Sequence, residues 1–189
     1  MEGRCNSTVL VIAAVGVSGS GKTTTLEYLV SRFSDQGYRV GTIKHIHHKD
    51  FSIDREGTNT WRYGAAGSKV VVAISPHEID IIKKTERELK DLDKIMALLE
   101  KEKLDIVFIE GFHSLIAKRT DVPKIITAKD QADLQKTLQG TVEPIIAATG
   151  IISENASETK FGEIPLINVP KQGERLVELI RTRLEQATA

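Results

Sequence analysis

The sequence predicts an α/β protein with three layers, in which helices flank a mostly parallel sheet that carries a small antiparallel extension. Two observations lead to this fold class. Apolar runs that suit buried strands alternate with segments of helical periodicity along most of the chain. A glycine-rich turn at Gly16–Gly21 joins the first apolar run directly to the first helical segment. The length of 189 residues suits a single domain, residues 1–189, large enough to bury a core.

The first half of the chain is expected to begin with a strand–helix–strand unit. Apolar residues recur at helical spacing after Lys22, and Gly37 is expected to end that helix. Further helices are expected at Glu56–Ala66 and in a stretch opened by Thr85 and Glu88, which have the capping-box spacing. The expected strands of this half, the last two as partners in a hairpin, are Val9–Val15, Arg39–Ile43, Lys69–Ile74 and Glu78–Lys83.

The second half is expected to continue the alternation. The helix opened by Thr85 carries an apolar stripe that suits core packing, formed by Leu89, Leu92, Met96 and Leu99. Strands are expected at Asp105–Ile109, Lys124–Ala128, Pro144–Ala148 and Ile164–Val169. A terminal helix is indicated by the spacing of Leu176, Ile180 and Leu184.

Composition restricts the classes of partner and the compartment. The formal net charge is +0 and the pI is about 7.0, so no overall field attracts nucleic acid or anionic membranes. The single cysteine, Cys5, excludes an internal disulfide and a cysteine zinc cluster. The apolar run Thr8–Val17 is too short to span a bilayer, and it lacks the basic leader of a secretory signal. We therefore expect a cytoplasmic protein with no nucleic-acid or membrane partner.

The strongest chemical signal is the segment Gly16–Thr23, which reads Gly-Val-Ser-Gly-Ser-Gly-Lys-Thr. It matches G-x-x-x-x-G-K-S/T, the P-loop, whose backbone N–H groups surround phosphate oxygens. Lys22 is expected to reach the β- and γ-phosphates, and Thr23 to offer its hydroxyl to Mg²⁺. The motif predicts a P-loop NTPase-like fold that binds a nucleoside triphosphate. The nucleotide-binding residues expected from it are Gly16, Ser18, Gly19, Ser20, Gly21, Lys22, Thr23 and Thr24.

An acidic partner for this loop is expected at Glu110. It follows the apolar strand Asp105–Ile109 and so emerges at the carboxyl end, where open α/β sheets bind ligands. The next residue, Gly111, permits a close backbone approach. We expect Glu110 to hold Mg²⁺ or position a water and to act with Lys22 in catalysis. The alternative is a solvated carboxylate at a strand end.

A histidine-rich turn, Lys44–Lys49, follows the second expected strand. Its histidines suit contact with phosphate or another ligand, a transition-metal site completed from elsewhere, or a solvated loop. Asp50 and Asp54 lie just beyond it and could serve Mg²⁺ through water. The residues of this stretch singled out for ligand or partner contact are Lys44, His45, His47, His48 and Arg62.

Four short segments together resemble the MobB family, the molybdopterin-guanine dinucleotide biosynthesis adapter proteins. They are Gly-Ser-Gly-Lys-Thr-Thr at 19–24, Val-Gly-Thr-Ile-Lys-His-x-His-His at 40–48, Asp-x-x-Gly-x-x-x-Trp-Arg at 54–62 and Ile-Glu-Gly-Phe at 109–112. The resemblance covers roughly the first two-thirds of the chain. It implies a homodimer that binds GTP with Mg²⁺ and hydrolyses it slowly. The implied partners are molybdopterin guanylyltransferase, which joins GMP to molybdopterin, and molybdopterin itself.

The sequence departs from the familiar patterns at two places. Asn59 stands where many family members carry an acidic residue, and no Asn-Lys-x-Asp segment is present to read guanine. The base-reading positions left open are Lys129-Asp130 and Ala148-Thr149-Gly150. Two other functions remain as alternatives. One is a P-loop small-molecule kinase with Lys118 and Arg119 as lid cations, and the other is a metallochaperone GTPase that uses the histidine-rich turn.

Overall fold

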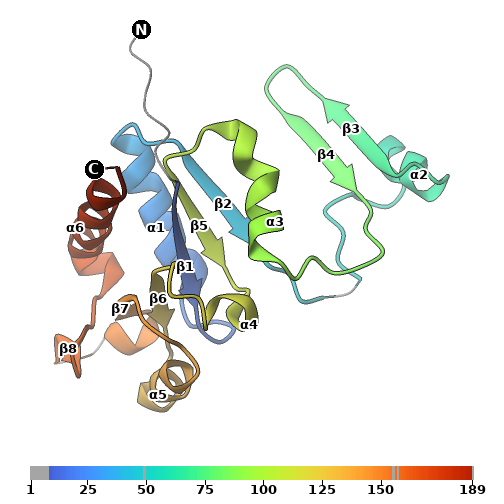
Figure 1. Cartoon of the computed structure of the whole chain (residues 1–189). Helices are drawn as coiled ribbons and strands as arrows, with labels where there is room; N and C mark the ends of the chain where they lie inside the picture. Colours follow the sequence, from blue (N-terminus) through green and yellow to red (C-terminus); the bar gives the residue numbers. More distant parts are fainter. Residues whose placement is uncertain (1–8, 49, 155, 157, 189) are drawn as a thin grey trace, which may run out of the picture. The chain divides into compact units, whose positions relative to one another are not determined.

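The computed structural model describes residues 9–48, 50–154, 156 and 158–188, so Cys5 and Lys49 lie outside the described residues. Internal contacts divide the chain into two compact units (Figure 1). The larger unit comprises residues 1–45 and 91–189, and the smaller comprises residues 46–90. The expectation of a single domain stays a prediction.

The larger unit contains a five-stranded parallel sheet with the order β2-β5-β1-β6-β7. This confirms the predicted α/β class with a mostly parallel sheet. The first strand lies at the centre, so the loop that follows it opens at the middle of the sheet's carboxyl edge. The five strands are β1 (Leu10–Val15), β2 (Val40–Lys44), β5 (Ile106–Glu110), β6 (Lys124–Thr127) and β7 (Ile145–Thr149).

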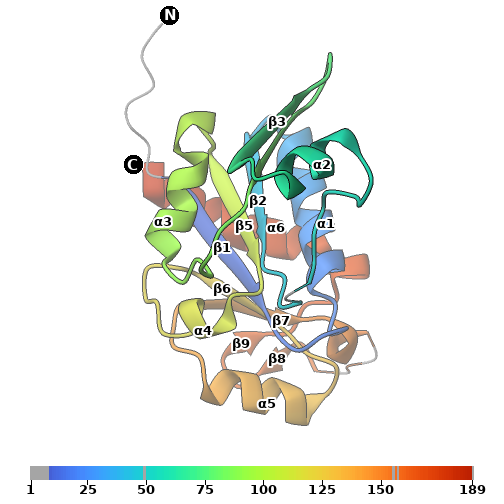
Figure 2. The same ribbon diagram turned by 90° about the vertical axis from the view of Figure 1, so that its right-hand side faces the viewer.

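Helices cover both faces of this sheet (Figures 1 and 2). On one face, α1 (Lys22–Asp35) and α6 (Val169–Thr188) pack against alternate strand residues such as Ile12 and Phe108. On the other, Ala13 and Val107 pack with residues of the shorter helices. These are α3 (Leu92–Met96), continued by the 3-10 helix Ala97–Glu102, then α4 (His113–Ile116) and α5 (Gln131–Gln139). Burial of both strand faces explains the continuous apolar runs in the sequence.

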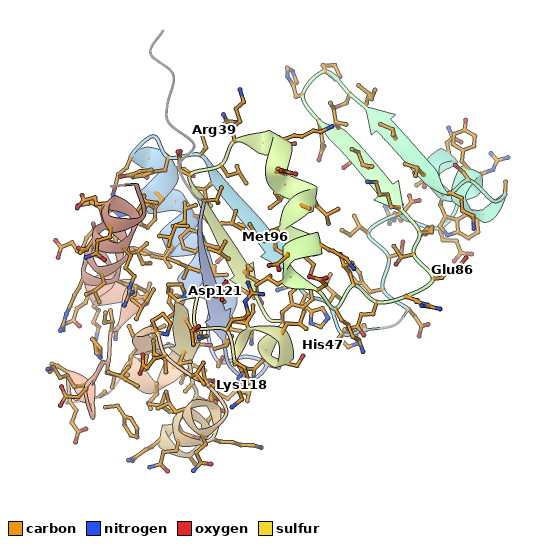
Figure 3. The ribbon with its side chains drawn as sticks, viewed as in Figure 1. Arg39, His47, Glu86, Met96, Lys118 and Asp121 are labelled. Carbon is orange, nitrogen blue, oxygen red and sulfur yellow. The ribbon has the colours of Figure 1, made fainter. Side chains whose placement is uncertain are left out.

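The smaller unit contains α2 (Asn59–Ala65) and an antiparallel hairpin of β3 (Val70–Ile74) and β4 (Ile79–Lys83). The predicted hairpin is confirmed, with Ser75 N–H donating to the Glu78 carbonyl oxygen at 2.8 Å across the turn. Side chains project from both faces of the hairpin (Figure 3). Val71 is only 7% exposed, whereas its neighbours along the strand are exposed.

The prediction that a helix begins at Thr85, with Glu88 completing a capping box, is wrong. The helix α3 begins at Leu92 instead, because the Asp91 side chain accepts hydrogen bonds from the N–H groups of Asp93 and Lys94. Leu89 is therefore outside the helix and 38% exposed, so it does not extend the core stripe.

Other elements differ from expectation, either in their bounds or because they were not predicted. The helix α2 begins at Asn59, because Thr58 caps it by accepting from Trp61 N–H at 3.3 Å. Of the predicted strand Ile164–Val169, Ile164–Pro165 forms β9 and pairs with β8 (Lys160–Phe161), Leu166 makes an isolated parallel bridge with Ala148, and Val169 already starts α6. The helices α4 and α5 were not predicted, although Asp130 is a residue type that marks a helix start, and its side chain caps α5 by accepting from Asp133 N–H.

Within the described part of the chain, no helix is long and apolar enough to cross a membrane.

Candidate functional site

The loop between β1 and α1 follows the path that its glycines allow. A Cβ at Gly16 would lie 2.0 Å from the Thr127 carbonyl oxygen, so a larger residue cannot occupy this position without a shift of backbone. The Ser20 side chain is fully buried beneath the loop, 2.6 Å from the Thr127 hydroxyl. The Ser20 side chain thus anchors the loop to β6. If Ser20 binds a phosphate, it would do so through its backbone N–H, because its side chain is buried. Thr127 was not predicted as a supporting residue.

The Lys22 ammonium folds back over the loop. Its Nζ donates to the carbonyl oxygens of Gly16 at 3.0 Å and Val17 at 2.6 Å. Burial lowers the pKa of Lys22 below its ordinary value; Glu110 opposes this shift and Lys44 adds to it. A partly desolvated cation at the first turn of α1 favours an anionic ligand.

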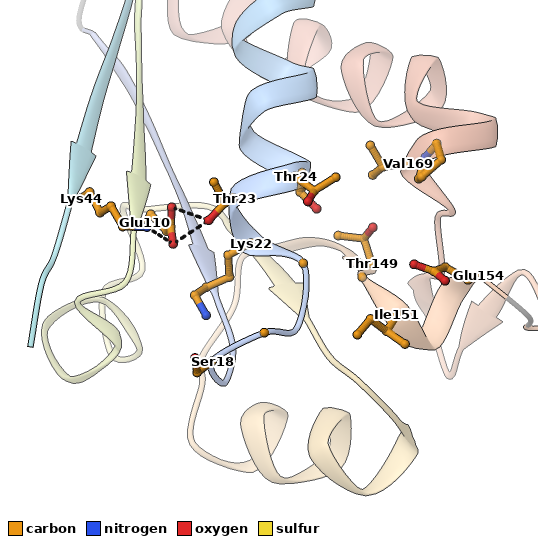
Figure 4. Close-up of a pocket in the computed structure, with 15 residues that line it drawn as sticks. Ser18, Lys22, Thr23, Thr24, Lys44, Glu110, Thr149, Ile151, Glu154 and Val169 are labelled. Carbon is orange, nitrogen blue, oxygen red and sulfur yellow. Dashed lines mark hydrogen bonds and ion pairs between the residues drawn. The ribbon is translucent and has the colours of Figure 1, made fainter.

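Glu110 meets Thr23 and Lys44 at the carboxyl edge of the sheet (Figure 4). Both Glu110 carboxylate oxygens lie 3.1 Å from the Thr23 hydroxyl, and Lys44 Nζ lies 2.5 Å from one of them. The strand register accounts for this meeting, because Glu110 pairs with Ala14 on β1 and with Lys44 on β2. Asp105 lies just before β5, at the end of the strand opposite Glu110, where its carboxylate accepts from Arg39 N–H at 2.7 Å.

The Thr23–Glu110 pair fits a magnesium ion. A hydroxyl and a carboxylate are the hard oxygen ligands that Mg²⁺ takes alongside phosphate and water. In this structure Lys44 already neutralises part of the Glu110 charge, so an entering divalent cation would compete with its ammonium.

A cavity of about 480 Å³ extends from this pair across the loop to the end of β7. Six of the predicted nucleotide-binding residues line it, namely Ser18, Gly19, Gly21, Lys22, Thr23 and Thr24. The lining residues that motif reasoning did not place in the site are Thr25, Ile151, Glu154, Val169 and Pro170. Thr25 follows the loop directly in α1, whereas the other four come from the 3-10 turn after β7 and the start of α6, so only the assembled fold brings those four to the loop.

Of the two positions left open for reading the base, only one lines the cavity. Thr149 and Gly150 line the cavity, whereas Lys129 and Asp130 do not. Asp130 caps α5, and the Lys129 side chain lies near Gly19, with Cε 3.5 Å from a Cβ built there. The sheet therefore favours the end of β7 over the end of β6 for a ligand that extends from the loop.

The His45 ring stacks on Phe112 with centroids 4.1 Å apart, beside the close approach predicted for Gly111, whose added Cβ would lie 3.1 Å from His45 Cβ. The other residues singled out in the histidine-rich stretch, His47, His48, Asp54 and Arg62, belong to the smaller unit. Asp54 accepts hydrogen bonds from the hydroxyls of Thr58 at 3.1 Å and Thr60 at 2.7 Å. Contact of this stretch with a nucleotide or Mg²⁺ stays a prediction.

The features proposed for the two alternative functions are also placed. Arg119 is held by Asp121 and Asp93, at 2.6 Å and 3.2 Å, while Lys118 is exposed in the turn that follows α4 (Figure 3). Among the described residues, no group of three or more His, Cys, Asp or Glu side chains is placed to hold a metal ion.

Comparison with known proteins gives a consistent assignment. Residues 11–150 match the family model MobB, described as molybdopterin guanine dinucleotide synthesis protein B. The chain is 32% identical over 126 residues to a molybdopterin-guanine dinucleotide biosynthesis adapter protein of Haemophilus influenzae, covering 67% of each chain. It is 32% identical over 133 residues to the Escherichia coli protein of the same name, covering 70% of this chain and 71% of that one.

A putative adapter protein of Methanocaldococcus jannaschii is 36% identical over 121 residues, but the match spans only 48% of its length. Among solved structures, Bacillus subtilis MobB aligns with a TM-score of 0.71 and 26% identity, covering 92% of this chain and 96% of that one. A Bacillus stearothermophilus homologue with 20% identity shares the fold, with a TM-score of 0.65 over 93% and 98% of the two chains. The chain therefore belongs to the MobB family.

Proposed function

We propose that this chain is a GTP-binding adapter that assists the formation of molybdopterin guanine dinucleotide and hydrolyses GTP slowly with Mg²⁺. The observation that carries the proposal is the convergence of Lys22, Thr23 and Glu110 on one cavity above the Gly16–Thr23 loop. The names of the Haemophilus influenzae and Escherichia coli relatives support the adapter role.

In this proposal the triphosphate lies on the loop backbone, with Lys22 turning from the Gly16 and Val17 carbonyls to the β- and γ-phosphates. Thr23 and Glu110 hold Mg²⁺, which would neutralise charge that develops on the phosphates when bound. We expect slow turnover, because phosphoryl transfer depends on charge stabilisation and no arginine is among the described residues that line the cavity.

The partners in this proposal are molybdopterin guanylyltransferase and molybdopterin, and the chain acts as a homodimer. The exposed face of the β3–β4 hairpin supports the dimer. Five apolar side chains share one face of the hairpin and are between 47% and 77% exposed. They are Val70, Val72, Ile74, Ile79 and Ile81. Pairing this hairpin face with that of a second copy would remove it from water.

The proposal is tested by titrating the purified chain with GTP in the presence and absence of Mg²⁺. We expect magnesium-assisted binding that Lys22→Ala abolishes. The matched control is Lys136→Ala, which removes an exposed lysine of α5 outside the cavity. Unchanged GTP affinity in a folded Lys22→Ala protein would refute the phosphate-binding role of the loop. Addition of the guanylyltransferase then tests the adapter role through the rate of dinucleotide formation.

A further inference from the structure

The cavity has a second half that neither the loop nor the Thr23–Glu110 pair explains. It is lined by Thr149, Gly150, Ile151, Glu154, Val169 and Pro170. Ile151 and Glu154 lie on the opposite side of the Lys22 loop from Glu110 (Figure 4). A triphosphate on the loop with its metal at Glu110 would therefore direct the rest of the nucleotide towards this half.

The turn that carries Ile151 and Glu154 is held firmly against the loop. A Cβ at Gly150 would lie 2.0 Å from the Ser20 carbonyl oxygen, so the two backbones are in close contact. The buried amide of Asn168 donates to the carbonyl oxygens of Ser153 at 3.2 Å and Glu154 at 3.4 Å. The Ser153 hydroxyl closes the turn on the Gly150 carbonyl oxygen at 2.6 Å. The turn thus has a fixed position relative to the phosphate site.

Thr149 points to a ligand in this half. Its side chain is 1% exposed, and its hydroxyl has no hydrogen-bond partner among the described residues. A buried hydroxyl without a partner is costly, so nearly all such groups in folded proteins are satisfied. Because Thr149 lines the cavity, a bound molecule is a suitable source of the missing acceptor.

The remaining lining groups indicate which chemical groups the bound molecule should carry. Glu154 supplies the carboxylate of this half, and it faces a site proposed to hold a polyanion, which it would repel unless a hydrogen-bond donor lay between them. Ile151, Val169 and Pro170 supply apolar surface that suits a flat ring, and Ile151 is 45% exposed. A purine with adjacent N–H donors satisfies both conditions, whereas a ring with only acceptors would leave the Glu154 carboxylate without a donor.

We propose that this half of the cavity reads guanine, an inference that rests on the proposed nucleotide-binding function. Glu154 accepts hydrogen bonds from N1–H and the N2 amine together, and Thr149 donates to N7. Ile151, Val169 and Pro170 cover the ring. Adenine presents a lone pair at N1 and no amine at C2, so it meets the Glu154 carboxylate with repulsion. A two-donor contact of this kind discriminates bases by roughly 10- to 100-fold.

The test exchanges donor and acceptor on both sides. Glu154→Gln keeps the shape of the side chain but replaces one acceptor by a donor. Xanthine carries a carbonyl oxygen at C2 in place of the amine, so the amide can donate to it while accepting from N1–H. We expect Glu154→Gln to lose GTP affinity by roughly 10- to 100-fold and to gain XTP affinity. ATP should bind no more weakly than before, because the amide removes the repulsion of adenine N1. Glu163→Gln, an exposed glutamate outside the cavity, is the matched control.

Thr149→Val gives an independent readout, because valine has the shape of threonine without the hydroxyl. We expect the ligand-free protein to keep or gain stability, while GTP and ATP both lose affinity by roughly 5- to 10-fold. A merely structural hydroxyl would give the opposite result, with lower thermal stability and unchanged nucleotide affinity.

The outcomes distinguish this inference from the function on which it rests. If the natural chain binds GTP and Lys22→Ala does not, but Glu154→Gln keeps the preference for GTP over ATP and XTP, only the base assignment is wrong. Equal affinity of the natural chain for GTP and ATP also overturns the base assignment alone. If the natural chain binds neither nucleotide, both proposals fail.

Discussion

Both carboxylate oxygens of Glu110 lie 3.1 Å from the hydroxyl of Thr23, although 87 residues separate them in the sequence. The central place of β1 in the sheet creates this contact, because β1 carries the loop into α1 and pairs directly with β5. We therefore expect Glu110→Gln to remove most of the gain in GTP affinity that Mg²⁺ provides, while metal-free binding remains. Calorimetric titration with and without Mg²⁺ measures this difference. Glu100→Gln, at an exposed position of the 3-10 helix, should behave as the natural chain.

Lys44 should restrain the entry of the metal ion. Its ammonium lies 2.5 Å from Glu110, and its side chain is 54% exposed, so the ion pair contributes only modestly. We expect Lys44→Met to raise the apparent Mg²⁺ affinity in the GTP complex by roughly twofold to fivefold. If Lys44 instead contacts the phosphates, Lys44→Met will lower the affinity for GTP at saturating Mg²⁺. That result would contradict competition between Lys44 and Mg²⁺ for Glu110.

The lowered pKa of Lys22 predicts a proton uptake on binding. In the folded protein Lys22 loses its proton at a lower pH than in the unfolded chain, where the ordinary value is 10.5. Stability should therefore rise with pH between the lowered value and 10.5, because the unfolded chain then binds more protons. A bound phosphate reverses this shift, so GTP binding should take up a proton in the same alkaline window and weaken as the pH rises. Calorimetry in buffers of different ionisation enthalpy measures the uptake, which should be absent near neutral pH.

Gly16 should be intolerant of a side chain. Its φ is 155°, and an added Cβ would lie 2.0 Å from a backbone oxygen, so Gly16→Ala must displace the loop or β6. We expect a loss of about 2–4 kcal/mol in the free energy of unfolding. Gly37→Ala is the control, because its φ of 85° is also left-handed but its Cβ would meet no atom within 4 Å. That variant should lose about 1–2 kcal/mol in urea denaturation.

The hairpin face gives a prediction about association. Val72 and Ile81 are paired across the strands and are 52% and 59% exposed. We expect the double variant Val72→Lys, Ile81→Lys to convert a dimer to a monomer in light scattering, with the monomer still folded. Glu78→Lys, in the adjoining turn, should leave the mass unchanged. A natural chain that is monomeric at the same concentration would contradict the proposed homodimer.

Local patterns in the sequence predicted the parts of the protein that depend on neighbours in the chain. The glycines of the Gly16–Thr23 loop, the apolar run before Glu110 and the turn of the β3–β4 hairpin are each encoded within a few residues. The false start at Thr85 shows the limit, because two cap signals lay close together and Asp91 prevailed. The spacing of residues alone does not choose between the two cap signals, because the choice depends on which apolar side chains become buried in the core.

The sequence by itself determined the glycine-rich segment Gly16–Thr23 and the strand end that carries Glu110. Only the tertiary structure decided which residues complete the cavity. Ser20 and Thr127 are 107 residues apart, and Thr149, Glu154 and Val169 reach the loop from separate elements. Their meeting follows from the order β2-β5-β1-β6-β7, which is set by how whole strands and helices bury their apolar faces together. Hydrophobic periodicity shows that a strand has buried faces, but the identity of its neighbours is a property of the packed sheet.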